Sequence, residues 1–217
     1  MTANPDQQPS NAAGDDPAGG PERVRVIACG MIAREVLAVR DQLGLDHLDL
    51  VCLPAMFHHY PDKIAPAMEA AIIEAREAGF TRIFAGYADC GTGGALDRVC
   101  EKYGIGRIAG PHCFSFYQGN AEAEARGDDD MRSFFMTDFL ARQFDAFLMK
   151  PLGLDRHPEL RDMYFGNYEK LVYLAQTDDP DLSARAEAAA ETLGLAYERR
   201  ITGYGDLTPA LAALKNG

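Results

Sequence analysis

Three of the five cysteines in this 217-residue chain follow short apolar runs that predict β-strands. They are Cys29, Cys90 and Cys113, and each has a glycine or proline within two residues. Three thiolates around one point repel one another unless a cation holds them, and zinc accepts three cysteines while keeping a fourth position open. A [4Fe–4S] cluster with one open iron is the alternative cofactor for such a site. The chain has no CxxC pair, so the spacing itself fits no common metal motif.

Histidines, glycines and one tyrosine near these cysteines extend the predicted site. His58 and His59 lie in a loop beyond the second predicted strand, and His112 directly precedes Cys113. Imidazole titrates near neutral pH, so these three histidines are the candidates for proton transfer. The glycines after Cys90 predict either an anion cradle at a helix start or a tight turn. The residues expected to bind the cofactor or substrate are Gly30, Gly91, Gly93, Gly94 and Tyr117.

The remaining cysteines, Cys52 and Cys100, lie inside a predicted strand and a predicted helix, where we expect them to pack in the core. The number of cysteines is odd, and the chain start lacks the features of an export signal. Reduced thiols and a cytoplasmic location are therefore expected.

Strand-like and helix-like segments alternate along the chain, which is typical of βαβ units. Strands are expected at 23–28, 48–53, 82–87, 107–109, 170–175 and 196–201. We predict an α/β fold with an open, mostly parallel, Rossmann-like sheet of about six strands and helices on both faces. Ligands of such sheets bind beyond the carboxyl ends of the strands. This places the three cysteines together.

The expected organisation is a disordered tail at 1–22 and one α/β domain at 23–217, with a helical insertion at about 116–166. The tail has few large apolar side chains to bury. The insertion is rich in aromatic residues, more than one helical stripe against a sheet requires, and this favours a homo-oligomer formed through it. Its phenylalanines are Phe134, Phe135, Phe139, Phe144 and Phe147.

The chain is acidic, with a formal net charge of −12 and a pI of about 4.8. An acidic surface repels phosphate backbones and anionic lipids, so nucleic acid and membranes are poor candidate partners. No apolar stretch approaches the roughly 18 residues that a membrane-spanning helix needs.

Several motifs together resemble an uncharacterised bacterial and archaeal group, domain-of-unknown-function family 1638. These are Ala28-Cys29-Gly30, His59-Tyr60-Pro61, Gly86 to Gly94 around Cys90, Gly110 to Cys113 with Gly119, and Phe165 to Tyr168. The family is expected to have an Arg and an Asp just before the third cysteine, where this chain has Gly110, Pro111 and His112. The resemblance implies a cytoplasmic α/β protein associated with corrinoid-dependent methyl-transfer systems, and hence a corrinoid protein as a partner.

These observations favour a metal-dependent enzyme of one-carbon or methyl-transfer metabolism, a methyltransferase whose three-cysteine zinc site activates a thiol or another small substrate. One alternative is a [4Fe–4S] protein with an open iron and lyase-like chemistry. Another is a non-catalytic accessory protein that carries a metal or a corrinoid.

Overall fold

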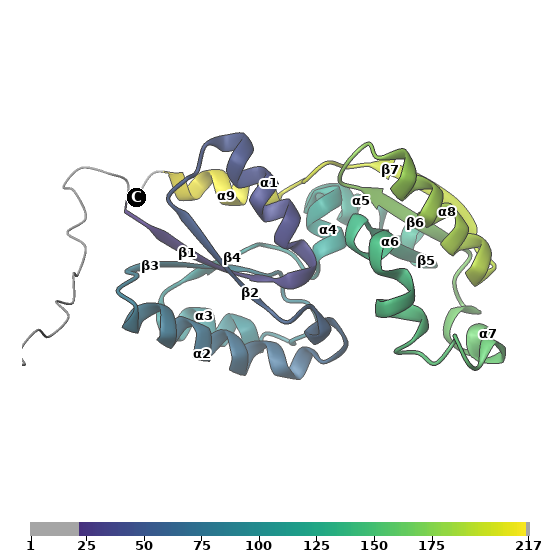
Figure 1. Cartoon of the computed structure of the whole chain (residues 1–217), viewed down its shortest axis with the longest axis horizontal. Helices are drawn as coiled ribbons and strands as arrows, with labels where there is room; N and C mark the ends of the chain where they lie inside the picture. Colours follow the sequence, from purple (N-terminus) through teal and green to yellow (C-terminus); the bar gives the residue numbers. More distant parts are fainter. Residues whose placement is uncertain (1–21, 216–217) are drawn as a thin grey trace, which may run out of the picture.

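A computed structural model describes residues 22–215, which fold around two parallel sheets (Figure 1). The first sheet has the strand order β2-β1-β3-β4 and the second the order β5-β6-β7. The strands are β1 (Val24–Cys29), β2 (Leu48–Leu53), β3 (Arg82–Gly86), β4 (Gly106–Arg107), β5 (Ser133–Thr137), β6 (Lys170–Ala175) and β7 (Ala196–Ile201).

Helices cover both faces of the first sheet, because side chains alternate along its central strand β1. Val26 and Ala28 face α1 (Ala33–Leu43) and α9 (Leu207–Ala212), whereas Ile27 faces α2 (Ile64–Glu77) and α3 (Ala95–Tyr103). All three side chains are fully buried. This sheet and these four helices are called the first lobe.

The second lobe is built around β6, whose residues Leu171 to Ala175 are all buried. Its helices are α6 (Asp138–Phe144), α7 (Arg161–Phe165) and α8 (Pro180–Leu193), and α6 and α8 pack together against the sheet. A π-helix, Asp145–Met149, continues α6. Short 3-10 helices complete the described chain at Gly30–Ile32, Ala55–His59, Pro61–Lys63, Pro158–Leu160 and Ala213–Lys215.

The chain passes between the lobes twice. It leaves the first lobe through α4 (Cys113–Gln118) and α5 (Asn120–Asp130), and it returns through residues 202–206 to α9. The two passages are tied together, since the Asp206 carboxylate accepts bonds from the Asn120 backbone N–H (2.7 Å) and side-chain amide (2.9 Å). Only glycine fits at position 205, because a Cβ there would lie 2.2 Å from the Phe116 carbonyl oxygen. The connection is therefore closely packed.

Both ends of the described chain lie at the amino-terminal edge of the first sheet. The Leu214 carbonyl accepts a bond from the Arg82 guanidinium (3.1 Å), and Arg82 is the register partner of Val24 at the start of β1. In Figure 1, α9 lies beside α1 although most of the sequence separates them.

The predicted α/β class with parallel sheets and helices on both faces is confirmed, but the strands divide into two sheets of four and three. The segment 116–166, expected to be helical, contains strand β5 besides its helices. Its β-favouring aromatic residues and its parallel pairing with β6 explain this strand. Of the predicted disordered tail at 1–22, residues 1–21 lie outside the described part. Within residues 22–215, none of the helices combines the length and apolar character required to cross a membrane.

The phenylalanines on which the oligomer prediction was based pack inside the molecule. Phe134 contacts Phe165 edge to face at 5.2 Å, and Phe139 contacts Phe147 in the same way at 4.9 Å. None of the five phenylalanines is exposed. They form no apolar surface patch, and the homo-oligomer stays a prediction without this support.

A fully buried carboxylate, Asp138, joins the carboxyl ends of β5 and β6. It accepts bonds from the Tyr173 hydroxyl (2.7 Å), the Thr177 hydroxyl (2.6 Å) and the backbone N–H groups of Gln176 and Thr177 (both 3.1 Å). Removing the acceptor would leave the buried Tyr173 hydroxyl and the buried Gln176 N–H unpaired.

We therefore expect Asp138→Ala to lower the free energy of unfolding by about 3–5 kcal/mol in chemical denaturation. The control is Asp178→Ala, which removes a carboxylate that is 78% exposed and pairs with Arg199 at the surface. That change should cost less than about 1 kcal/mol. Equal losses in the two variants would contradict the role given to Asp138.

Candidate functional site

The three cysteines of the predicted site line one cavity of about 20 Å³ at the carboxyl edge of the first sheet. His58 and Tyr87 also line it. A cavity of this volume holds about one water-sized particle. It is the size of a single ion and much smaller than an iron–sulfur cube.

Parallel strands and their loops bring the thiols together. Cys29 is the last residue of the central strand β1, and Cys90 lies in the loop after the neighbouring strand β3. That loop pairs with the loop after β4, since the backbone N–H of Cys90 donates to the Pro111 carbonyl at 2.7 Å. Two residues beyond Pro111, Cys113 begins α4. Three separate segments therefore meet at one place.

The backbone at Cys90 is strained. Its φ is +50°, and it is the only non-glycine residue with a positive φ among residues 22–215. Cysteine rarely adopts this left-handed conformation, and such strain is found most often at functional sites. The fold holds Cys90 there through the bond to Pro111.

The glycines after Cys90 form a tight turn around the Asp89 side chain. The backbone N–H groups of Gly93 and Gly94 donate to this carboxylate at 3.3 and 2.9 Å, and the Thr92 hydroxyl donates at 2.7 Å. The Gly94 N–H and the Thr92 hydroxyl lower the pKa of Asp89. An anion bound in the predicted cradle would have to displace this carboxylate. Gly91 shares the turn, with φ +80°.

Gly30 brings the start of α1 close to the segment after β2. A Cβ at position 30 would lie 3.1 Å from the Leu53 carbonyl oxygen and the Ala55 nitrogen. That segment continues into the 3-10 helix with His58 and His59. The small residue therefore lets the histidines approach the thiol cavity.

The thiols are held in their neutral form by their surroundings. Burial raises the pKa of all three, and for Cys90 to about 12 with a further contribution from Cys29. No Lys or Arg is among the described residues that line the cavity. Across residues 22–215, no three His, Cys, Asp or Glu side chains already stand at ligand positions. Holding an ion would therefore require the thiols to turn inward and lose their protons.

The three histidines occupy different places. His58 lines the thiol cavity while part of its side chain stays exposed, and desolvation on the cavity side, with a smaller contribution from His59, lowers its pKa. His59 packs against Phe147 at 5.5 Å, and its buried Nε2 has no hydrogen-bond partner. His112 stacks on Phe114 at 3.7 Å and does not line the cavity. Of the three, only His58 is placed beside the thiols.

Two tyrosines lie close to the thiols. Tyr117, which the sequence analysis included, is buried, and burial raises its pKa, with smaller contributions from Glu35, Cys113 and Cys29. Tyr87 was missed. Its buried hydroxyl has no partner in standard hydrogen-bond geometry and lies near the Cys29 sulfur. The sequence could have indicated Tyr87, because it directly follows β3 and precedes Cys90 by three residues.

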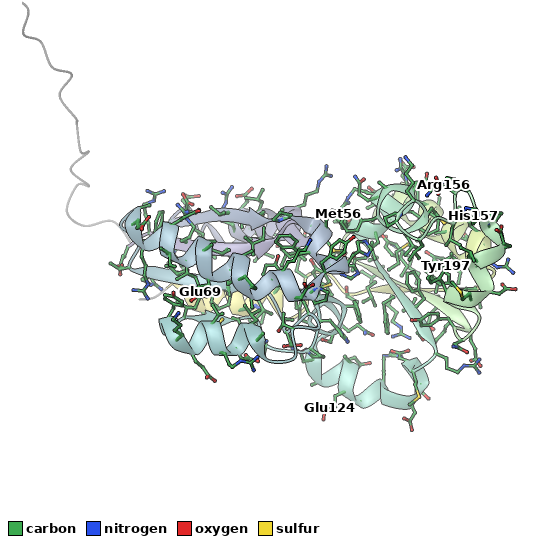
Figure 2. All side chains as sticks on the ribbon, turned by 90° about the horizontal axis from the view of Figure 1, so that it is seen from below. Met56, Glu69, Glu124, Arg156, His157 and Tyr197 are labelled. Carbon is green, nitrogen blue, oxygen red and sulfur yellow. The ribbon has the colours of Figure 1, made fainter. Side chains whose placement is uncertain are left out.

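A larger cavity of about 360 Å³ lies between the lobes and adjoins the thiols. We call it the interlobe pocket. Met31, His58 and Cys113 line both cavities. Met56, from the same 3-10 helix as His58, lies at the junction of the lobes, whereas Glu124 on α5 points away from it (Figure 2). A molecule in the interlobe pocket would thus touch the thiol cavity.

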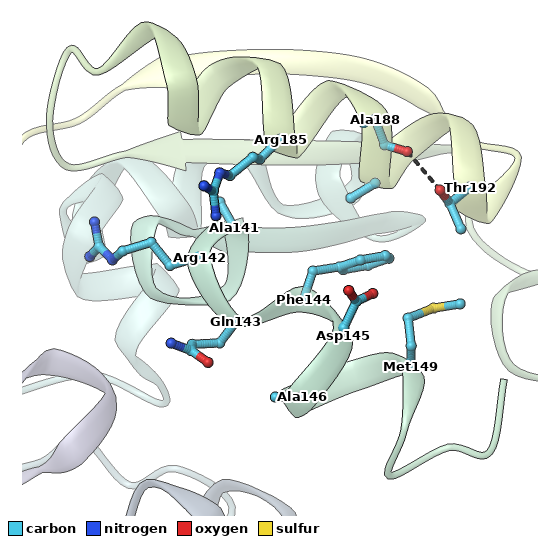
Figure 3. Close-up of a pocket in the computed structure, with 11 residues that line it drawn as sticks. Ala141, Arg142, Gln143, Phe144, Asp145, Ala146, Met149, Arg185, Ala188 and Thr192 are labelled. Atoms are coloured by element: carbon cyan, nitrogen blue, oxygen red, sulfur yellow. Dashed lines mark hydrogen bonds between the residues drawn. The ribbon is translucent and has the colours of Figure 1, made fainter. Parts of the chain in front are cut away.

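A third hollow of about 370 Å³ lies between α6 with its π-helix and α8 (Figure 3). Arg142, Arg185 and Asp145 line it, together with Phe144 and Met149. It contains none of the predicted site residues. Its size is therefore not evidence for the chemistry of the cysteines.

The raised pKa values predict slow alkylation of the site thiols. At pH 8 the fraction of Cys90 present as thiolate is about a thousandfold lower than for a thiol of pKa 9.0. The greater nucleophilicity of a more basic thiolate offsets part of this. Cys52, predicted to pack in the core, is exposed, whereas Cys100 is buried as expected. Desolvation raises the pKa of Cys52 too, but we still expect iodoacetamide to modify Cys90 at least about tenfold more slowly than Cys52, as measured by mass spectrometry on metal-free protein. In guanidinium all five thiols should react alike, and equal native rates would contradict the buried site.

Comparison with known proteins identifies a family. The model described as "Protein of unknown function (DUF1638)" matches residues 52–211. No curated protein and no solved structure matches the chain. The matched segment includes Cys90, Cys113 and the loops that join them, and Cys29 precedes it. Because the match covers most of the chain, this protein belongs to the DUF1638 family.

Proposed function

We propose that this protein is a metal-dependent enzyme of one-carbon or methyl-transfer metabolism, in which Cys29, Cys90 and Cys113 hold one zinc ion. A single observation carries the proposal. Thiols from three separate segments line one cavity with room for about one ion, and that cavity adjoins a pocket of substrate size. The volume favours a single ion over a [4Fe–4S] cluster.

The composition of the cavity supports a bound cation. Three thiols are soft ligands that zinc accepts, and no protein cation among the lining residues stabilises their thiolates. The backbone at Cys90, a residue that lines the cavity, is held in a strained conformation at a free-energy cost. A cysteine that only packs in the core gains nothing from this backbone strain, whereas a metal ligand gains the correct position for its sulfur.

A bound zinc ion would supply Lewis acidity, which lowers the pKa of a substrate thiol. His58, neutral and next to the thiols, is placed to accept the proton as the substrate S–H bond breaks. The substrate sulfur would then bond to the methyl carbon, and the donor would keep the electron pair of the broken bond. The resemblance to the family suggests a corrinoid protein as that donor.

The metal content of serine variants tests the site. Wild-type protein purified without added metal should contain about one zinc per chain by elemental analysis. Cys29→Ser, Cys90→Ser and Cys113→Ser should each lose most of it, while Cys52→Ser and Cys100→Ser keep it. A brown protein that absorbs light near 400 nm would instead indicate a [4Fe–4S] cluster at this site. Metal-free wild type, or equal metal in all variants, would overturn the proposal.

Proton release gives a second test. Because burial keeps the three thiols protonated, zinc binding to the metal-free protein should release about three protons near neutral pH. Affinity should therefore fall by up to about a thousandfold for each unit that the pH decreases. Calorimetry in two buffers of different ionisation enthalpy counts the protons. Cys113→Ser should release one fewer, and release of no protons would refute thiolate ligation.

A further inference from the structure

The interlobe pocket has a strongly apolar wall. Six of the side chains that form it are Phe114, Phe134, Phe135, Leu140, Phe147 and Leu148. They come from α4, β5, α6 and the π-helix that follows it. The volume of about 360 Å³ equals that of roughly a dozen water molecules in the liquid. The pocket is therefore large enough for a molecule with one ring or a short branched chain.

Two polar atoms in this wall have no hydrogen-bond partner. The Ser133 side chain is only 6% exposed, and its Oγ bonds to no protein atom. The buried Nε2 of His59 is also unpaired. Buried polar groups are normally paired, because an unmade hydrogen bond costs free energy. Both residues line the pocket, so a ligand that displaces the atoms now covering Ser133 Oγ and His59 Nε2 would offer them a hydrogen bond.

The described residues that line the pocket include no permanent positive charge. Neither Lys nor Arg is among them. The one carboxylate in the wall, Asp130, already pairs with both terminal nitrogens of Arg200 at 2.6 and 2.7 Å. An anion would have to leave water without gaining a counter-charge, which is unfavourable.

We propose that the interlobe pocket binds an uncharged small molecule with an aromatic or branched aliphatic body, whose neutral hydrogen-bonding group contacts Ser133 and His59. Because Met31, His58 and Cys113 line both cavities, the other end of this molecule lies beside the thiols. If the proposed function holds, that end carries the substrate thiol that is methylated. The binding of the molecule in the pocket does not depend on the proposed function.

Benzyl alcohol is a suitable probe, and 4-(hydroxymethyl)benzoate is its charged counterpart. In saturation-transfer NMR titrations of the full-length protein as purified, benzyl alcohol should bind saturably. The carboxylate should bind at least about tenfold more weakly, since no cation receives it. Ser133→Ala should weaken benzyl alcohol binding about five- to tenfold. Equal binding of the two probes, or no effect of Ser133→Ala, would overturn the inference.

Ser115 supplies the matched control. It is as buried as Ser133, but its hydroxyl already donates to the His112 carbonyl at 2.8 Å, and it does not line the pocket. Ser115→Ala should melt at a lower temperature and bind the probe like wild type. Ser133→Ala loses no protein hydrogen bond, so its melting temperature should be unchanged or higher. A lower melting temperature for Ser133→Ala would mean that its hydroxyl is satisfied, against the inference.

The cysteine variants separate this inference from the proposed function. Cys29→Ser lies outside the interlobe pocket and should keep benzyl alcohol binding even if it loses all metal. Binding that depends on Ser133 in a protein that holds no metal would support the pocket and refute only the metal site. Loss of metal from the cysteine variants, together with no probe binding to wild type, would refute only the pocket.

Discussion

The parallel direction of every strand pair is the constraint on which the rest of the structure depends. Parallel strands end at one edge, so all loops that follow them open on the same side. For this reason Cys29 and Cys90 meet although two strands, β2 and β3, and two α-helices separate them in the chain. The bonds between the loops after β3 and β4 then extend the same edge to Cys113. The site is thus a consequence of sheet topology and not of any local motif.

A largely buried charged contact joins the two lobes. Glu35, in the first turn of α1, accepts a bond from Arg142 on α6 at 3.1 Å, and a guanidinium nitrogen of Arg142 lies 3.9 Å from Asp138. Glu35 is only 4% exposed, and burial raises its pKa. Desolvation offsets much of the attraction in such pairs. We infer that this contact mainly determines which surfaces of the two lobes face each other. Glu35→Gln should therefore change the solution scattering profile while leaving the melting temperature nearly unchanged.

Local patterns predicted β6 from its apolar run, and β6 and β7 both have the predicted bounds, although β7 is largely polar. Strand β5 was missed because it forms by pairing with β6, a distant segment that local spacing does not reveal. The cysteines were recognised as a group because each follows a strand. Tyr87 and Ser133 were not, since an unpaired hydroxyl is defined only by its folded surroundings. The stacking of His112 on Phe114 likewise depends on the folded position of α4.

The return of the chain to the first lobe has a consequence for synthesis on the ribosome. Leu207 and Leu211 of α9 are fully buried in the same core as β1 and α1, so this core is incomplete until the end of the chain emerges. The second sheet, from β5 to β7, is continuous in sequence and is complete earlier. We infer that released chains truncated before residue 207 have a protease-resistant second lobe while the first lobe still lacks part of its core. The usual order, in which the amino-terminal part of a protein folds first, would then be reversed.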